Sequence, residues 1–124
     1  MVPQAREAIA FARPGGEACV PSKGRPIDLV HLARQTMGDR ALEQEVLSMF
    51  VQQLAIARER LLSAGQDERK RLAHTLKGSA AGVGAFSIAE CAAGIEDAPA
   101  RTELFDRLGT LIDEARDFIA AINR

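Results

Sequence analysis

The most unusual histidine of this chain lies in the run 67–85, which reads DERKRLAHTLKGSAAGVGA. His74 is followed by Lys77 three residues later and by Gly78 four residues later. Free imidazole titrates near neutral pH, so a neutral ring offers a nitrogen lone pair that can take a phosphoryl group. On a helix, Lys77 lies on the same side as His74, where its charge can pair with added phosphate. The spacing makes His74 a candidate phosphate acceptor.

Gly78 and the lysines give this prediction a second basis. A glycine inside a helix costs about 1 kcal/mol relative to alanine, and Gly78 lies one turn after His74, where a side chain would screen the ring. Its absence opens the approach to the imidazole, although a close helix–helix contact would also require glycine. Lys77 and Lys70 can act as a cationic field for phosphate, or can simply be solvated residues of an exposed face.

Other chemistries of histidine find less support in the sequence. His31 is the second of two histidines, and neither HxxxH nor HExxH spacing is present, which argues against a metal site. A Ser–His–Asp arrangement is not excluded by counting, but there is no GxSxG turn. The segment Lys77–Ser79 lacks the leading glycine of a GxxxxGK[ST] nucleotide loop. The chain is therefore expected to receive phosphate from a partner and not from ATP.

Five helices are predicted to position these residues, and strand signals are nearly absent. The first should end at Gly38, and the second should begin after an Asp39 N-cap. The third should begin after Asp67. The predicted helices cover Ile27–Met37, residues 40 to about 64, 68 to about 83, Ala85–Asp97 and Arg101–Ile122. Amphipathic helices with short links indicate an all-α fold, an antiparallel four-helix bundle with the short first helix capping one end.

Helical periodicity predicts which face of each long helix is buried. On the third helix the core face leaves His74 pointing to solvent. The core residues predicted for the second helix are Leu42, Val46, Met49, Phe50, Ala57 and Leu61, and those for the third are Leu72, Leu76, Ser79, Ala80 and Val83. Those predicted for the fourth helix are Ile88, Cys91, Ala92 and Ile95, and those for the fifth are Leu104, Leu108, Leu111, Ala115, Phe118 and Ile122.

Composition limits the class of protein. The 124 residues suit one domain, and the 47% hydrophobic content supports a core without cross-links. A net charge of -1 gives no sign of a nucleic-acid-binding surface. Cys19 and Cys91 do not form a metal-type pair, and no apolar run suits a signal peptide or a membrane helix, so a cytoplasmic location is expected. Residues 1–26, rich in proline and glycine, are predicted to be an N-terminal extension with a short helix over Gln4–Ala12, and residues 27–124 to be the domain.

The third helix also resembles the signature of histidine-phosphotransfer (Hpt) domains. That signature is a histidine followed by Leu-Lys-Gly-Ser/Ala and then by small residues that end in an apolar residue and a glycine. Three other parts of the chain are similar to the family, and the resemblance covers about 27–123. The segments that carry it are Ala73–Ala80, Gly82–Ala85, Ile27–Leu29, Leu47–Phe50 and Cys91–Glu96.

The resemblance implies a four-helix bundle with an exposed histidine that is phosphorylated on Nε2. It implies that Lys77 favours the phosphoryl charge and that Gly78 leaves room for the partner's active site. Glu96 matches a position that hydrogen-bonds the histidine in some relatives, where it can be Gln. A carboxylate there would accept from Nδ1–H and fix the tautomer. Gln53, polar and near the apolar face of the second helix, is a further candidate to reach His74.

The resemblance also implies the partners. The chain would be a free-standing, monomeric carrier in a His–Asp phosphorelay, taking phosphate from one receiver domain and passing it to another. The receivers would belong to hybrid histidine kinases and response regulators. They would supply Mg²⁺, so this chain needs no cofactor and has no autokinase activity. No nucleic acid or membrane partner is expected. Two alternatives remain: the phosphoacceptor helix pair of a sensor kinase, and a helical interaction module without phosphorylation.

Overall fold

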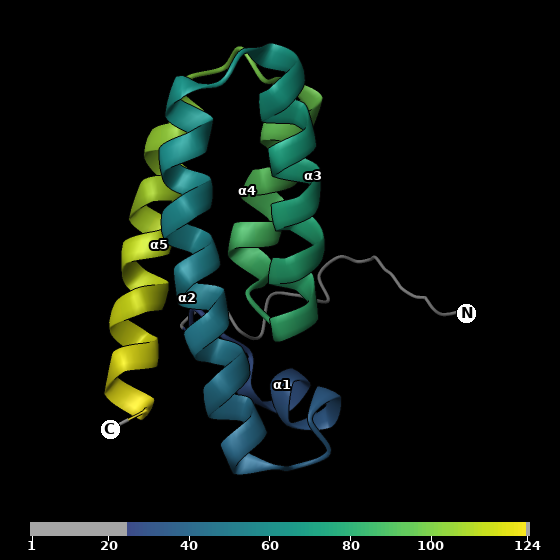
Figure 1. Cartoon of the computed structure of the whole chain (residues 1–124), viewed down its shortest axis with the longest axis vertical. Helices are drawn as coiled ribbons and strands as arrows, with labels where there is room; N and C mark the ends of the chain where they lie inside the picture. The colour runs from purple at the N-terminus through teal and green to yellow at the C-terminus, as the bar shows by residue number, and fades with distance from the viewer. Residues whose placement is uncertain (1–24, 124) are drawn as a thin grey trace, which may run out of the picture.

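The computed structural model describes residues 25–123, and within them every regular element is a helix. The all-α prediction is confirmed. Figure 1 shows the longer helices running along the long axis, with the short first helix beside the end at which the second helix begins. The five helices are α1 (Leu29–Gln35), α2 (Arg40–Ser63), α3 (Gln66–Val83), α4 (Phe86–Asp97) and α5 (Glu103–Ile122). Cys19 and the helix predicted over Gln4–Ala12 lie outside the described residues.

Two aspartates begin the first two helices by capping free backbone N–H groups. The Asp28 carboxylate accepts from the backbone N–H groups of Val30 and His31, and the Asp39 carboxylate accepts from that of Leu42. The Asp39 cap is as predicted. The first helix is shorter than predicted at both ends. It begins at Leu29 and not at Ile27, because Asp28 is its N-cap, and it ends before residue 37, because Met37 and Gly38 adopt left-handed φ values of 54° and 77°.

Two further boundaries differ from the prediction by two residues. Helix α3 begins at Gln66 with Gly65 as its N-cap, so Asp67 lies in the first turn and does not cap the helix. Helix α5 begins at Glu103 and not at residue 101, because the backbone N–H of Arg101 donates to the carbonyl of Ala98 in a turn after α4. The turn hydrogen bond of Arg101 delays the start of α5, whereas the first helical hydrogen bond of α3 runs from the backbone N–H of Arg69 to the carbonyl of Gly65.

The buried face of α2 is rotated relative to the prediction. Leu42 and Met49 are 42% and 63% exposed, so their placement in the core was wrong. The buried side chains of α2 are Leu47, Phe50, Leu54 and Leu61. Leu42, Met49 and Ile56 form a second apolar row at heptad spacing on the solvent side. A helix with two apolar rows buries the one that faces its neighbours, and the sequence of α2 alone does not say which row that is.

The buried faces of α3, α4 and α5 agree better with the prediction than that of α2. All four residues predicted for α4 are buried, as are Leu76 and Ala80 of α3. On α5 the buried stripe centres on Ile112 and Ile119, two residues that were missing from the prediction. The predicted residues Leu104, Leu111, Phe118 and Ile122 pack at its edges and are only partly buried. Small residues such as Ala73, Ala80 and Ala92 let α3 and α4 lie close together.

The turn between α3 and α4 sets the register of these two helices. Gly84 ends α3 with a left-handed φ of 91°, and its backbone N–H donates to the carbonyl of Ala81. The Gly84 carbonyl accepts from the backbone N–H of Asp28 at 2.9 Å, which fastens the start of α1 to this turn. The chain then returns as α4, antiparallel to α3 and in extensive contact with it. Across residues 25–123, no helix is both long enough and apolar enough to cross a membrane.

Candidate functional site

His74 lies near the middle of α3 and its side chain is 68% exposed. The core positions of this helix are taken by Ala73, Leu76 and Ala80, and the imidazole therefore projects away from the bundle interior. The solvent-facing orientation predicted from periodicity is confirmed. A ring in this position can be reached by a second protein.

The carboxylate of Glu96, on α4, holds both polar groups of the site. Its Oε2 lies 2.8 Å from Nδ1 of His74 and its Oε1 lies 2.8 Å from Nζ of Lys77. The hydrogen bond from Lys77, and secondly that from His74, hold the pKa of the Glu96 carboxyl below its usual value. An ionised carboxylate can only accept hydrogen bonds, so Nδ1 of His74 carries the hydrogen and donates. In the neutral ring, Nε2 then has the free lone pair.

Lys77 lies on the same side of α3 as His74, as predicted, and its ammonium group is bound to Glu96. The side chain remains partly exposed, and its long stem allows the ammonium group to turn toward a charge on the ring. The sequence did not reveal that both His74 and Lys77 share one carboxylate, because this depends on the register between α3 and α4. Lys70, one turn before His74, is exposed.

Gly78 is not required by helix packing. A Cβ built at Gly78 meets no atom within 4 Å, and the same holds for Gly82 one turn further on. The alternative explanation of Gly78, a close helix–helix contact, is therefore wrong. The helix is open beside His74, and the helix-weakening glycine has no structural role that the described residues account for.

Gln53 does not contact His74, contrary to the sequence expectation. Its Nε2 donates to Oγ of Ser79 at 3.2 Å, so Gln53 connects α2 to the neighbouring face of α3. A helical wheel gives the direction of a side chain but not its height along the bundle, and here the antiparallel pairing of α2 and α3 places Gln53 level with Ser79. That hydrogen bond also leaves Ser79 away from His74, and no Ser–His pair is seen among the described residues.

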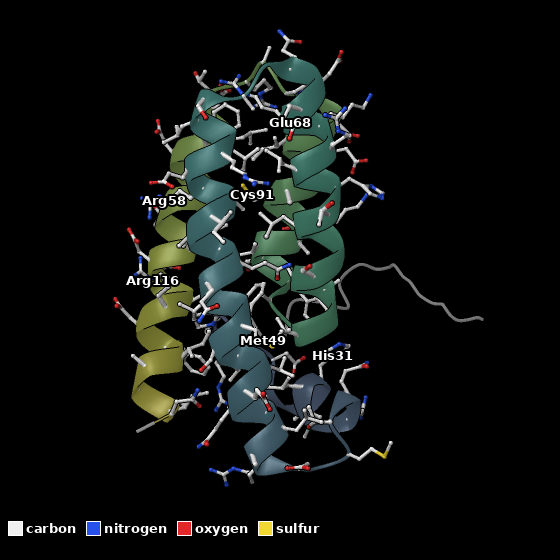
Figure 2. The ribbon with its side chains drawn as sticks, viewed as in Figure 1. His31, Met49, Arg58, Glu68, Cys91 and Arg116 are labelled. Carbon is white, nitrogen blue, oxygen red and sulfur yellow. The ribbon has the colours of Figure 1, made fainter. Side chains whose placement is uncertain are left out.

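The second histidine belongs to a different part of the molecule. His31 lies on α1 at the end of the bundle (Figure 2) and packs edge-on against Phe86, with ring centroids 5.1 Å apart. Its Nε2 atom is buried and has no hydrogen-bond partner in the described structure. No group of three or more metal-ligating side chains is found within residues 25–123. The expectation that the chain itself binds no cofactor stays a prediction.

Comparison with known protein families decides the class of this four-helix bundle. The family model described as "Hpt domain" matches residues 45–118, which is more than half of the chain. The chain belongs to the Hpt domain family. Hpt domains act in histidine phosphotransfer within phosphorelays, as carriers and not as catalysts. No curated protein and no solved structure matches the chain.

The family match covers the central part of the chain. It begins within α2 and ends within α5, so α1 and the residues before it lie outside the matched range. The predicted boundary between an extension 1–26 and a domain 27–124 stays a prediction. Because the chain belongs to the Hpt family, the alternative interpretation as the phosphoacceptor helix pair of a sensor kinase is not supported.

Proposed function

We propose that this protein carries a phosphoryl group on Nε2 of His74 in a multistep His–Asp phosphorelay. It would receive the group from the aspartyl phosphate of one receiver domain, such as that of a hybrid histidine kinase, and pass it to the receiver of a response regulator. The observation that supports this most directly is the exposed imidazole whose Nδ1 is bonded to Glu96 at 2.8 Å. That bond leaves the outward nitrogen as the nucleophile.

The transfer step needs few groups from the carrier. The Nε2 lone pair forms a bond to phosphorus as the bond from phosphorus to the aspartate oxygen breaks, and the aspartate leaves as a carboxylate. Mg²⁺ and the acidic pocket belong to the receiver, and no metal or nucleotide is expected on this chain. Lys77 can turn from Glu96 toward the phosphoryl oxygens and offset their negative charge. The same step in reverse passes the group on.

The receiver would dock over the outer faces of α2 and α3. Gly78 leaves the surface beside His74 low, and Met49 and Ile56 of α2 are exposed apolar side chains. The hydrogen bond from Gln53 to Ser79 shows that these two residues lie at the same height along the antiparallel helices α2 and α3. Ile56, three residues after Gln53, therefore lies about one turn closer than Gln53 to the height of His74 along the bundle axis. Exposed apolar side chains on one helix are typical of a protein-binding surface, and these lie on the helix that packs against α3.

Incubation with a receiver labelled on its aspartate tests the proposal. Wild-type protein should gain an acid-labile, alkali-stable label, as a phosphoramidate bond would give, and His74→Gln should gain none. His31→Gln is the matched control, because it removes the other histidine of the chain and should be labelled normally. Label that persists in His74→Gln, or wild-type protein that takes no label from any receiver of the same cell, would contradict the proposal.

A further inference from the structure

Phosphorylation changes what the Nδ1 atom of His74 must do. Before transfer the ring is neutral, with hydrogen on Nδ1 and a lone pair on Nε2. Once Nε2 is bonded to phosphorus, a ring that keeps its Nδ1 hydrogen carries a positive charge. When a nucleophile takes the phosphoryl group from such a ring, the leaving group on phosphorus is the neutral imidazole. If the Nδ1 proton has been lost, the departing group is an imidazolate anion, which leaves far less readily.

The position of Glu96 bears directly on this proton. Its Oε2 lies 2.8 Å from Nδ1, on the side of the ring opposite the outward-facing Nε2, so the carboxylate is close to the ring cation and farther from the phosphoryl group. We infer that Glu96 is a positioning residue that keeps the proton on Nδ1 after Nε2 is phosphorylated, and so keeps the phosphoryl group ready for transfer. This inference rests on the proposed role of His74 and concerns the energy of the phosphorylated state.

The surrounding charges support this assignment. The charged groups on this face are Lys70 and Lys77 from α3 and Glu96 from α4; Arg71 of α3 pairs with Glu68. No ion pair from α2 or α5 reaches His74 or Glu96 in the described part of the chain. Among these charged groups, Glu96 contacts the imidazole ring through Oε2, and its Oε1 binds the ammonium group of Lys77. A negative charge at hydrogen-bond distance favours a cation much more than a neutral amide does.

The exchange of protons and electrons balances without another reactant. In the forward step the P–Nε2 bond forms, the P–O bond of the aspartyl phosphate breaks, and the positive charge stays on the ring beside Glu96. In the return step the P–Nε2 electron pair goes back to the ring as phosphorus is attacked by the second aspartate. The Nδ1 proton remains between the ring and Glu96 throughout. A glutamine at position 96 could still accept from Nδ1–H, but without the charge that retains the proton.

The inference can be tested without any receiver. Full-length wild-type protein and Glu96→Gln would be phosphorylated with phosphoramidate, freed of donor, and followed for release of inorganic phosphate between about pH 5 and 9. Loss of phosphate is fast from the protonated ring and slow from the deprotonated one. We expect the midpoint of the Glu96→Gln profile to lie roughly one pH unit below that of wild type, the scale of shift that a charge in contact produces. Glu90→Gln, an exposed position on the same helix, is the matched control and should follow the wild-type profile.

The outcomes separate this inference from the proposed function. If wild type and Glu96→Gln are both phosphorylated on His74 and have the same pH profile, Glu96 does not retain the proton, while the acceptor role stands. If phosphoramidate labels His74→Gln as strongly as wild type, the acceptor role itself fails. Ring ¹⁵N chemical shifts of the phosphorylated wild-type protein give a second readout that needs no variant. They should show Nδ1 protonated at a pH where free phosphohistidine has lost that proton, and the opposite result would overturn the inference.

Discussion

One carboxylate decides which nitrogen of His74 is available. Glu96 accepts from Nδ1 and also binds Lys77, so it fixes the tautomer of the ring and the resting place of the nearest cation. Periodicity alone predicted that His74 faces solvent, because the apolar neighbours of that residue define the core side of α3. The contact with Glu96 was predicted from family resemblance, and the wheel made it feasible. The shared contact with Lys77 was not predicted, since it depends on how two helices align.

The ionisation of Glu96 gives a pH dependence of stability. Its pKa is lowered in the folded protein, chiefly by the hydrogen bond from Lys77. A carboxyl whose folded pKa is depressed stabilises the fold above its unfolded pKa, and this contribution is lost as the pH falls through the folded value. The difference in free energy of unfolding between wild type and Glu96→Gln should therefore be largest near neutral pH and should narrow as the pH falls below the usual carboxyl value of 4.5.

Urea denaturation of both proteins at several pH values would measure this difference, with Glu90→Gln as the control for loss of a carboxylate from α4. A gap between wild type and Glu96→Gln that widens toward acid pH would contradict the assigned direction of the pKa shift.

Gly78 gives a prediction about access to His74. Gly78→Leu should fold well, because a Cβ at this position meets no atom and leucine improves helix propensity by roughly 0.5–1 kcal/mol. It should nevertheless slow transfer from a receiver by about tenfold or more, since a bulky group beside the ring displaces the docked partner. Phosphorylation by the small donor phosphoramidate should change much less. Stopped-flow or gel-based transfer assays would compare the two donors.

Gly82→Leu is the matched variant for Gly78→Leu, because Gly82 is equally open but two turns from His74. It should gain similar helix stability and lose less of the transfer rate. Equal rates for wild type and Gly78→Leu with a receiver would show that Gly78 does not serve access to His74.

At the level of elements, helix identity was predictable and helix orientation was only partly so. The N-cap at Asp39 and the buried stripe of α4 follow from local chemistry, and the structure agrees with both. The buried face of α2 was misplaced, because Leu42 and Met49 are as apolar as the residues that are buried. Which of two apolar rows is covered depends on the neighbouring helices, and that is tertiary information.

The turn at Gly84 can be tested as the element that sets the α3–α4 register. Gly84 has a φ of 91°, and an added Cβ would lie 2.8 Å from the carbonyl oxygen of Asp28. Gly84→Ala should therefore lower the free energy of unfolding by about 1–3 kcal/mol, through backbone strain and the displaced start of α1. Gly82→Ala, in the same helix with open space around it, should be neutral or stabilising. Chemical denaturation of the two variants would check this, and similar stabilities would contradict it.

At the level of the whole molecule, the candidate site lies on one face of the bundle, apart from the contacts that hold its two ends. The site uses the middle of α3 and the last turns of α4, whereas α1 closes one end of the bundle and the α2–α3 and α4–α5 connections meet at the other. The architecture was predictable from helix number, amphipathicity and short links. The side-chain contacts that hold the ends of the bundle were not predictable from the sequence, because they join side chains to backbone carbonyls of residues far apart in the sequence.

Arg69 makes such a contact at the end where the two connections meet. Its guanidinium group donates to the carbonyl of Leu61 at the end of α2 and to that of Pro99 before α5, and it lies 4.6 Å from the centre of the Phe105 ring. Hydrogen bonds from a charged group and a cation–π contact together predict a loss of about 1–3 kcal/mol in the free energy of unfolding for Arg69→Met. The transfer rate at His74 should be unchanged, because Arg69 lies on the core-facing side of the first turn of α3, outside the site.

Arg71→Met is the matched control for Arg69→Met, since Arg71 pairs with Glu68 on the exposed side of the same helix and such surface pairs contribute roughly 0–1 kcal/mol. Thermal and urea unfolding of the two variants, each measured beside its phosphotransfer rate, would separate stability from function. If Arg69→Met cost no more stability than Arg71→Met, the contacts of Arg69 would not hold this end of the bundle. If it slowed transfer while remaining folded, the two regions would be coupled, because the packing of this end would then influence the position of His74 through α3.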